Sequence, residues 1–555
     1  MKKEAIFHLN TEDFIYPVSR KKLLVKLRTA KDDAKSCVLI YFSRTSPESI
    51  RECFMEKEYS DELFDYYEGF IDTKEVARYQ KYYFGITDND GNTSYVGSNG
   101  ISDDVPENDF FEYLYTNPGD VVSIPQWAQG TVYYQIFPER FANGDKSNDP
   151  DGTMEWGSIP TRENYMGGDL KGIKDTIPYL KDLGVETIYL NPIFHGDFNH
   201  KYATTDYYRI DPIFGSNENF RDLVKELHQS GIRILLDGVF NHVGIHFKQF
   251  EDVLEKGNKS RYSDWFLLKK EDGINITHKD YECVGAYKFM PKLNTSYREV
   301  REFILDVMDY WIREYEIDGW RLDVSDEVDI RVWQEASTIL RERYPDIILL
   351  GETWGYGGRL VGDKKLDTVM NYMFRDAVRD YFGYHKISTT AFVDRISRML
   401  ALYKDETSKA LYNLIGSHDT ERFLFFCKGD KQSLKAAVAF QMLFVGAPAI
   451  YYGDEVGMTG DNDPDCRGCM LWGDQQDKEL LEYYKELIRL RKQHSAIRRG
   501  DFRITEIDDE RGVIGFKRFD ENEEIEVYIT NGNVAEKPYS IKVVSNKGGY
   551  ENERT

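Results

Sequence analysis

The stretch DGVFNH, from Asp237 to His242, ends one predicted β-strand in the middle of this 555-residue chain, and three similar segments end later strands. These segments are GWRLDV at 319–324, GETW at 351–354 and GSHD at 416–419. Amphipathic stretches with helical periodicity lie between the strands, for example at 221–230 and 298–314. Polar residues at strand ends, alternating with helices, are typical of a β/α barrel, in which the carboxyl ends of all strands meet on one rim.

Strands and helices alternate from about residue 131 to residue 455, and eight strand candidates can be counted. They span residues 131–137, 186–194, 233–240, 318–324, 347–354, 368–372, 412–418 and 448–455. The sequence therefore predicts an α/β fold, a (β/α)8 TIM barrel, as a catalytic domain over residues 123–495. Residues 243–292 are too many for an ordinary βα loop and are predicted to form an inserted domain after strand three.

The two flanks of the barrel show strand-like alternation without helical stretches. Residues 1–122 are predicted to form an N-terminal β-sandwich, and residues 496–555 a short C-terminal β-sandwich domain. The chain is thus predicted to place one barrel between two β domains.

The carboxylates of the four segments suit the cleavage of a glycosidic bond. Cleavage with retention needs one carboxylate as nucleophile and a second carboxyl group that protonates the leaving oxygen and then activates water. Asp323 is the predicted nucleophile, because Arg321 points to the same face of its strand and a neighbouring cation lowers the pKa of a carboxyl group. Glu352 is the predicted acid, because the apolar run before it and Trp354 after it give a partly desolvated setting that favours its protonated form.

Three more residues of these segments are predicted to contact the sugar. Asp419 is placed to hydrogen-bond hydroxyl groups and, as a like charge, to favour the protonated form of Glu352. His242 and His418 are suited to donating hydrogen bonds as charge develops in the ring. Asp237 is given a supporting role. Any one segment alone is explained equally well as a solvated loop start, but four in this order indicate an active site.

The four segments together resemble the α-amylase superfamily of glycoside hydrolases, over roughly residues 125 to 490. The stretch MPKLN at 290–294 resembles the signature of the neopullulanase, cyclomaltodextrinase and maltogenic amylase subfamily. The resemblance implies a retaining hydrolase of cyclodextrins, maltooligosaccharides and pullulan, with Asp323 as nucleophile, Glu352 as acid/base and Asp419 as transition-state stabiliser. It also implies substrate-binding roles for Tyr202 of the NHKY segment, His242, Arg321, His418, Asp463 and Arg467.

Some of these assignments have alternatives that the sequence leaves open. Asp463 and Arg467 match positions that bind the sugar on the non-reducing side of the cut, yet an internal salt bridge between them explains their spacing as well. Trp354 suits stacking on the acceptor side and suits a core position equally. The chain has Gly355 where its relatives usually have His, and VSDE at 324–327 where they have VANE. These differences leave open the ratio of hydrolysis to transglycosylation and the choice between α-1,4 and α-1,6 bonds.

Two other classes of function remain open on the sequence. A transglycosylase, a glucanotransferase or an α-glucosidase acting on short α-glucosides uses the same covalent intermediate, and MPKLN favours the hydrolase. A catalytically silent binding module is the less favoured alternative, because Asp323, Glu352 and Asp419 are all retained.

A calcium site and a homodimer are also expected. Oxygen-bearing residues cluster after the first barrel strand, in a pattern that suits structural Ca²⁺ and resembles the calcium site of the subfamily. They are Asn143, Asp145, Asn148, Asp149, Gly167 and Asp169. An ion-free turn is the alternative, because Asn, Asp and Gly are ordinary turn residues. The subfamily's N-terminal, carbohydrate-binding-like domain often packs on a partner's active site, which implies a possible homodimer; a purely stabilising domain is the alternative.

Composition excludes several partners. The balance of 96 acidic and 72 basic residues gives a net charge of -24, which repels nucleic acids and anionic membranes. No apolar stretch approaches the roughly 20 residues of a membrane span, and no secretory signal is recognised at the N-terminus. Six scattered cysteines suggest reduced thiols and a cytoplasmic setting. Cys466 and Cys469 form a CxxC without a second pair, so a metal or redox role is not expected.

Overall fold

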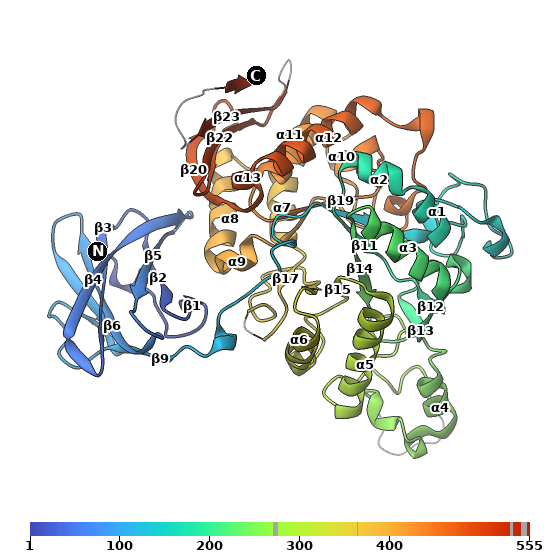
Figure 1. Ribbon diagram of the computed structural model, residues 1–555, viewed down its shortest axis with the longest axis horizontal. Helices are drawn as coiled ribbons and strands as arrows, with labels where there is room; N and C mark the ends of the chain where they lie inside the picture. Colours follow the sequence, from blue (N-terminus) through green and yellow to red (C-terminus); the bar gives the residue numbers. More distant parts are fainter. Residues whose placement is uncertain (270–275, 363, 533–536, 546–551, 555) are drawn as a thin grey trace.

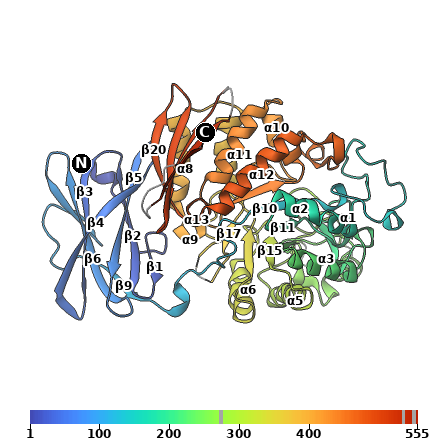
Figure 2. The ribbon, with the colours of Figure 1, turned by 45° about the horizontal axis from the view of Figure 1, so that its top comes forward.

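Figure 1 shows the computed structural model of the protein, which describes residues 1–269, 276–362, 364–532, 537–545 and 552–554. A β domain at the N-terminus lies beside a central β/α barrel, and a second β domain packs on the barrel near the C-terminus (Figures 1 and 2). None of the helices in these ranges has the length and apolar character needed to cross a membrane.

The N-terminal domain is a β-sandwich whose two halves share one long strand. Its strands are β1 (Ile15–Ser19), β2 (Lys22–Ala30), β3 (Ala34–Ser43), β4 (Ser46–Ser60), β5 (Phe64–Asp72), β6 (Arg78–Asp88), β7 (Thr93–Gly97), β8 (Gly100–Ser102) and β9 (Phe111–Tyr115). The first part of β4 pairs with β3 and its last part pairs with β5, so the sheet folds around a core that includes Leu23, Leu39 and Phe84.

The barrel strands run parallel in the order β17, β16, β15, β14, β11, β10, β19, β18. Their bounds are β10 (Tyr133–Ile136), β11 (Thr187–Leu190), β14 (Arg233–Gly238), β15 (Gly319–Leu322), β16 (Ile348–Gly351), β17 (Thr368–Val369), β18 (Tyr412–Leu414) and β19 (Ala447–Tyr451). A parallel bridge between Met370 and Tyr412 joins the two ends of this series and closes the barrel. Each of these eight strands lies within or close to a predicted strand, so the predicted (β/α)8 barrel is confirmed.

Helices surround the barrel. They are α1 (Leu170–Asp175), α2 (Ile177–Leu183), α3 (Asn217–Gln229), α5 (Arg298–Tyr315), α6 (Ile330–Arg343), α7 (Tyr372–Val378), α8 (Thr389–Leu402), α9 (Asp405–Ser408), α10 (Phe423–Phe426), α11 (Lys431–Leu443), α12 (Lys478–Gln493) and α13 (Ser495–Arg499). Helix α3 illustrates the local rules. The Ser216 side chain accepts the N–H of Asn219 at its start, and Phe220, Leu223 and Leu227 are buried along one face at helical spacing.

The segment after β14 leaves the barrel as a separate lobe. It contains α4 (Lys248–Lys256) and returns through antiparallel bridges that pair His242 with Lys292 and Phe266 with Leu293. A hairpin of β12 (Phe194–Asp197) and β13 (Ala203–Ile210) stands between β11 and α3. These two insertions rise on the same rim as the strand ends and provide walls for the site.

Both β domains are fastened to the barrel. The Lys26 ammonium group donates hydrogen bonds to the carbonyl oxygens of Ala401 and Tyr403 at the end of α8, at 3.1 and 3.0 Å. The C-terminal sheet places Phe516 against Phe440 of α11, with ring centroids 5.9 Å apart. Its described strands are β20 (Asp501–Asp508), β21 (Val513–Phe519), β22 (Glu523–Thr530), β23 (Tyr539–Ser545) and β24 (Asn552–Arg554).

Candidate active site

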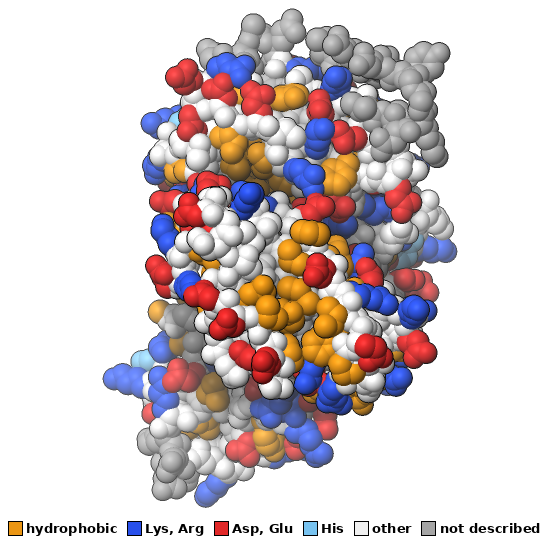
Figure 3. Space-filling view, turned by 90° about the vertical axis from the view of Figure 1, so that its left-hand side faces the viewer, with side chains coloured by type: hydrophobic (Ala, Val, Ile, Leu, Met, Phe, Trp, Pro, Cys, Tyr) orange, Lys and Arg blue, Asp and Glu red, His pale blue; other side chains and the backbone are white. Residues whose placement is uncertain are grey.

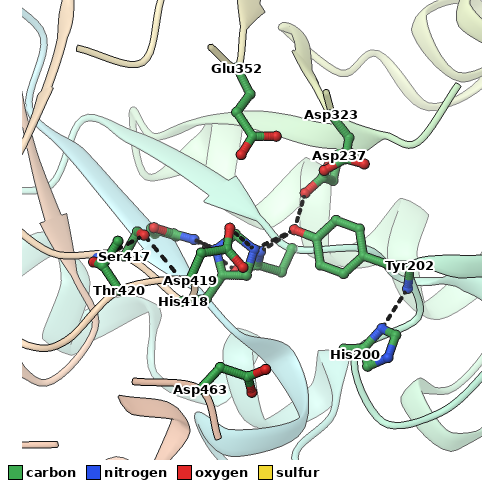
Figure 4. Close-up of polar contacts among 12 residues, drawn as sticks. His200, Tyr202, Asp237, Asp323, Glu352, Ser417, His418, Asp419, Thr420 and Asp463 are labelled. Atoms are coloured by element: carbon green, nitrogen blue, oxygen red, sulfur yellow. Dashed lines mark hydrogen bonds and ion pairs between the residues drawn. The ribbon is translucent and has the colours of Figure 1, made fainter. Parts of the chain in front are cut away.

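Three carboxylates meet at the carboxyl ends of the barrel strands. Asp323 directly follows β15, Glu352 directly follows β16, and Asp419 lies five residues after β18. All three line one cavity of about 450 Å³ at the mouth of the barrel. The Asp323 and Glu352 residues are each only 5% exposed. Figure 4 shows Glu352 and Asp323 above the network of Tyr202 and His418, with Asp419 beside His418.

A single buried cation connects the carboxylates. The Arg321 guanidinium donates from Nη1 to Asp237 at 2.9 Å and to Asp323 at 2.8 Å, and its Nη2 lies 2.8 Å from Glu352. Asp237 of β14 is the register partner of Arg321 on β15. The arginine is completely buried. Arg321 is therefore the shared counter-charge of Asp237, Asp323 and Glu352. Asp237 supports the site by holding the arginine in place.

Burial and charge act in opposite directions on Asp323. Desolvation raises the pKa of the Asp323 carboxyl well above its ordinary value, and the ion pair with Arg321 opposes that rise. The effect of Arg321 has the predicted sign. Burial, reinforced by the like charges of Glu352 and Asp237, outweighs the attraction of this one cation, so the shift in the unliganded site is upward.

The backbone after Asp323 orients Glu352. Val324 adopts a left-handed conformation with φ of 45°, which is a strained geometry for a β-branched residue. In this conformation its N–H donates to Glu352 Oε2 at 2.9 Å. Ser325 donates its hydroxyl to the Glu352 carbonyl oxygen at 2.6 Å. Local strain thus places a backbone donor where it fixes the Glu352 carboxyl group.

His418 lies behind the cavity wall and holds other residues in place. Its Nδ1 accepts a hydrogen bond from Gln135 at 2.7 Å, so the remaining proton is on Nε2. That nitrogen lies 2.6 Å from the Tyr202 hydroxyl and 3.0 Å from Asp419. Burial lowers the pKa of His418, so the ring is neutral at physiological pH. His418 therefore positions Tyr202 and Asp419, and Tyr202 in turn donates to Asp237 at 2.9 Å.

The pKa of Asp419 is raised toward neutral pH. Desolvation, reinforced by the nearby Glu352, raises the pKa of Asp419 to about 7. Across the cavity, burial lowers the pKa of His242 to about 4, so this ring is neutral. Neutral imidazole retains one N–H, which is sufficient for the predicted hydrogen bond to a sugar hydroxyl.

The structure bears on two of the alternatives that the sequence leaves open. Trp354 is 54% exposed and stacks on Tyr372 with ring centroids 4.2 Å apart, so it is not a core residue. Asp463 and Arg467 do form a salt bridge, at 3.0 Å, and both also line the cavity. Arg467 reaches further to Asp419 at 3.3 Å. Asp463 and Arg467 can therefore form the salt bridge and contact the substrate at the same time.

Sequence reasoning missed several lining residues. Arg162 and Glu163 come from a long loop before α1, and Phe198, Tyr287 and Phe289 form a run of contacting aromatic rings on the inserted walls. Gln135 does not line the cavity but supports His418, and its place near the end of a barrel strand is a usable signal. The loop residues offered no comparable signal, because their approach to the site depends on long-range folding.

The residues of the expected calcium site lie together in the loop before α1. Asn143 donates from its amide nitrogen to Asp149 at 2.8 Å, and Asp169 accepts backbone N–H groups of Asp145 and Gly172. The amide oxygens of Asn143 and Asn148 are buried without a hydrogen-bond partner. Within the described ranges, no group of three or more His, Cys, Asp or Glu side chains is placed to hold a metal ion. A cation here would rely on the amide oxygens.

Comparisons with known proteins agree with this geometry. A model of the alpha amylase catalytic domain matches residues 135–500, and a model of the alpha amylase N-terminal ig-like domain matches residues 1–117. The chain is 42% identical to Neopullulanase 2 of Thermoactinomyces vulgaris, over 98% of this chain and 94% of that protein. It is 37% identical to the Intracellular maltogenic amylase of Bacillus subtilis (strain 168), over 97% and 92%. A solved structure named Cyclomaltodextrinase superposes with a TM-score of 0.91 at 39% identity, covering 96% of this chain and 92% of that one.

Proposed function

The chain belongs to the α-amylase family of glycoside hydrolases, and from this premise we propose that it hydrolyses α-1,4 bonds, with α-1,6 bonds as a second candidate linkage, in cyclodextrins, maltooligosaccharides and pullulan. The observation that carries the proposal is the pair of buried carboxyl groups of Asp323 and Glu352, bridged by one guanidinium at the mouth of the cavity. Relatives named for cyclodextrins, pullulan and maltose support the substrate class.

In the proposed mechanism Asp323 attacks the anomeric carbon while Glu352 gives its proton to the leaving glycosidic oxygen. The bond to the leaving sugar breaks as the bond to the aspartate forms. Glu352 then takes a proton from water, and the water displaces Asp323 with a second inversion, which gives net retention. Asp419 and His242 are placed to bind hydroxyl groups of the same ring as positive charge develops in it.

A product profile tests this function. We expect β-cyclodextrin to be opened rapidly and soluble starch to be attacked slowly, when each is incubated with the protein beside pullulan and maltotriose and analysed by chromatography. Maltose, glucose and panose are the expected main products. Cleavage of none of the four substrates by the folded protein would contradict the proposal and favour the silent binding module.

Transglycosylation is retained as a second activity because of Trp354. This exposed ring lines the same cavity as Glu352, and it stacks on Tyr372. A sugar stacked there competes with water for the covalent intermediate. Addition of excess glucose to the cyclodextrin reaction should then yield longer transfer products. If no transfer products form, hydrolysis is the only activity.

We also propose that Ca²⁺ stabilises the loop before α1. The orphaned amide oxygens of Asn143 and Asn148, with the Asp149 carboxylate close to Asn143, fit the oxygen ligands that calcium prefers. Asp145, Asp169 and the Gly167 carbonyl complete the proposed donor set, and Asp169 also serves as the N-cap of α1. The ion would hold the loop against the barrel and take no part in the reaction.

Removal of calcium should lower the thermal unfolding midpoint by a few degrees, since a ligand that binds only the folded state stabilises it by about 3 kcal/mol at a hundred times its dissociation constant. The measurement compares EDTA-treated protein with and without added CaCl2. Replacing both Asn143 and Asn148 by alanine should remove the response. An equal response in that double variant would place the ion elsewhere.

A homodimer and a cytoplasmic setting complete the proposal. Figure 3 shows hydrophobic side chains gathered on the face that the N-terminal domain presents, and Ile50, Phe54 and Leu114 of that domain are more than half exposed. A second copy would cover them and narrow the cleft.

The cytoplasmic setting rests on the thiols. All six cysteines are free thiols, and one relative is named intracellular. Secretion of the protein by its host cells would contradict the cytoplasmic setting. A sedimentation mass equal to one 64.9 kDa chain would contradict the homodimer.

A further inference from the structure

The loop between β16 and β17 carries Trp354, which lines the active-site cavity. The Trp354 ring stacks on Tyr372, and the next residue is Gly355, around which the space for a side chain is open. Glycine also leaves the backbone free to adopt many conformations. The position of the backbone that carries Trp354 therefore depends on contacts made further along the loop.

The residues at the end of helix α8 supply these contacts. The Gly357 N–H donates to the hydroxyl oxygen of Tyr403 at 2.9 Å. The Tyr356 hydroxyl donates to the carbonyl oxygen of Leu402 at 2.8 Å, and its ring meets the Tyr403 ring edge to face, with centroids 5.1 Å apart. Gly357 and Tyr403 are both buried. A buried N–H without a partner is unfavourable, so the Tyr403 hydroxyl fixes where the loop runs.

A lysine of the N-terminal domain holds the same helix end. The Lys26 ammonium group of β2 donates to the carbonyl oxygens of Ala401 and Tyr403, and it lies 3.5 Å from Glu68 on the neighbouring strand β5. Ala401 belongs to the last turn of α8, where carbonyl groups lack helical partners and a nearby cation is favourable. Lys26 is buried and therefore anchors the end of α8 to the N-terminal domain, which lies beside this helix (Figure 1).

The other end of the loop contacts the N-terminal domain directly. The Lys365 ammonium group donates to the Glu12 carboxylate at 2.8 Å. The loop is thus tied to this domain at Lys365 and, through the end of α8, at Gly357. All of these contacts lie within one chain, so they need no partner subunit.

We propose that the N-terminal domain positions Trp354 in its own chain, through Lys26, Tyr403 and the loop backbone, and so controls how well the leaving sugar binds. The inference rests on the proposed hydrolase function. Glu352 gives its proton to the leaving oxygen, so the leaving sugar lies next to Glu352 and within reach of the loop that follows it. Lys26 and Tyr403 do not line the cavity, and they are therefore positioning residues.

Two substrates separate binding of the leaving sugar from the other steps. Maltotriose releases glucose, whereas α-maltosyl fluoride releases fluoride and places no sugar against Trp354. In Tyr403→Phe, the buried Gly357 N–H loses its acceptor, and kcat/KM for maltotriose should fall at least about fivefold. The value for α-maltosyl fluoride should stay within about twofold, because the groups that act on the retained sugars are unchanged.

A double-mutant cycle shows whether Tyr403 acts through Trp354. In a Trp354→Ala background, Tyr403→Phe should change kcat/KM for maltotriose by less than about twofold. Lys26→Met combined with Glu68→Gln removes the anchor without leaving a charge buried alone, and it should reproduce the selective loss. Tyr483→Phe is the matched control, because the Tyr483 hydroxyl also donates to a backbone carbonyl, that of Lys435, and does not line the cavity. It should leave both values unchanged.

Three results for Tyr403→Phe would overturn the proposal. They are no loss, an equal loss on both substrates, and a loss on maltotriose that persists in the Trp354→Ala background. Full activity of the Lys26 and Glu68 double variant on maltotriose would overturn the role of the N-terminal domain. Failure of the unaltered protein to cleave either substrate would instead overturn the proposed function, so the two failures are distinguishable.

Discussion

Replacing Asp323 by asparagine is expected to lower the turnover of β-cyclodextrin by roughly 10⁴-fold or more, as removal of a nucleophile does in other covalent mechanisms. Asparagine has nearly the same shape, so the Arg321 contact to Asp237 and the fold should persist. Turnover is measured by ring opening and folding by thermal unfolding. Asp326→Asn is the control, because Asp326 is exposed in the same loop and should change the rate only a few-fold.

Azide distinguishes a lost nucleophile from a damaged site. In Asp323→Ala the small anion can occupy the space of the carboxylate and displace a good leaving group, such as fluoride from a maltosyl fluoride, in one inverting step. In Glu352→Ala the Asp323 intermediate still forms, and azide in place of water should give a product of retained configuration. The same configuration from both variants, or near-normal turnover in Asp323→Asn, would show that the nucleophile is misassigned.

The barrel was predictable because its strands are short and apolar and alternate with amphipathic helices. Strands β15 and β16 each end directly before a predicted catalytic carboxylate, so the motif and the strand count support each other. The ion pair between Arg321 and Asp237 is harder to predict from the sequence. Asp237 meets it because β14 and β15 pair in one particular register, and that register is a property of the closed barrel rather than of either segment.

Charge states were harder to predict than residue identities. The sign of the Arg321 effect on Asp323 follows from spacing along one strand, yet the larger opposing effect of burial depends on everything packed around the site. His418 shows the same limit. Its motif position predicts a sugar contact, whereas its hydrogen-bond distances to Gln135 and Tyr202 follow only from the closed barrel.

Arg321→Met should cost at least about 10³-fold in turnover and about 3–5 kcal/mol of folding free energy at pH 7, because it leaves Asp237 and Asp323 buried without their counter-charge. Methionine fills much of the same space, so packing is largely kept. The measurement compares denaturant midpoints of the two proteins by tryptophan fluorescence. Arg331→Met is the control, because Arg331 is 52% exposed and its ion pair with Asp329 lies at the surface.

The pH dependence of this destabilisation identifies its cause. Burial already raises the pKa of Asp237 and Asp323 in the folded protein, and Arg321 opposes the rise at both. Without the arginine these folded-state pKa values move further above the unfolded value of about 4. A carboxyl with a raised folded pKa favours folding below its unfolded pKa, and that contribution is lost as pH rises toward its folded pKa. The difference between the two proteins should therefore shrink as the pH falls from 7 toward the unfolded pKa of about 4. A constant difference would attribute the loss to packing, and Arg321 would then not be the charge that makes a buried carboxylate site possible.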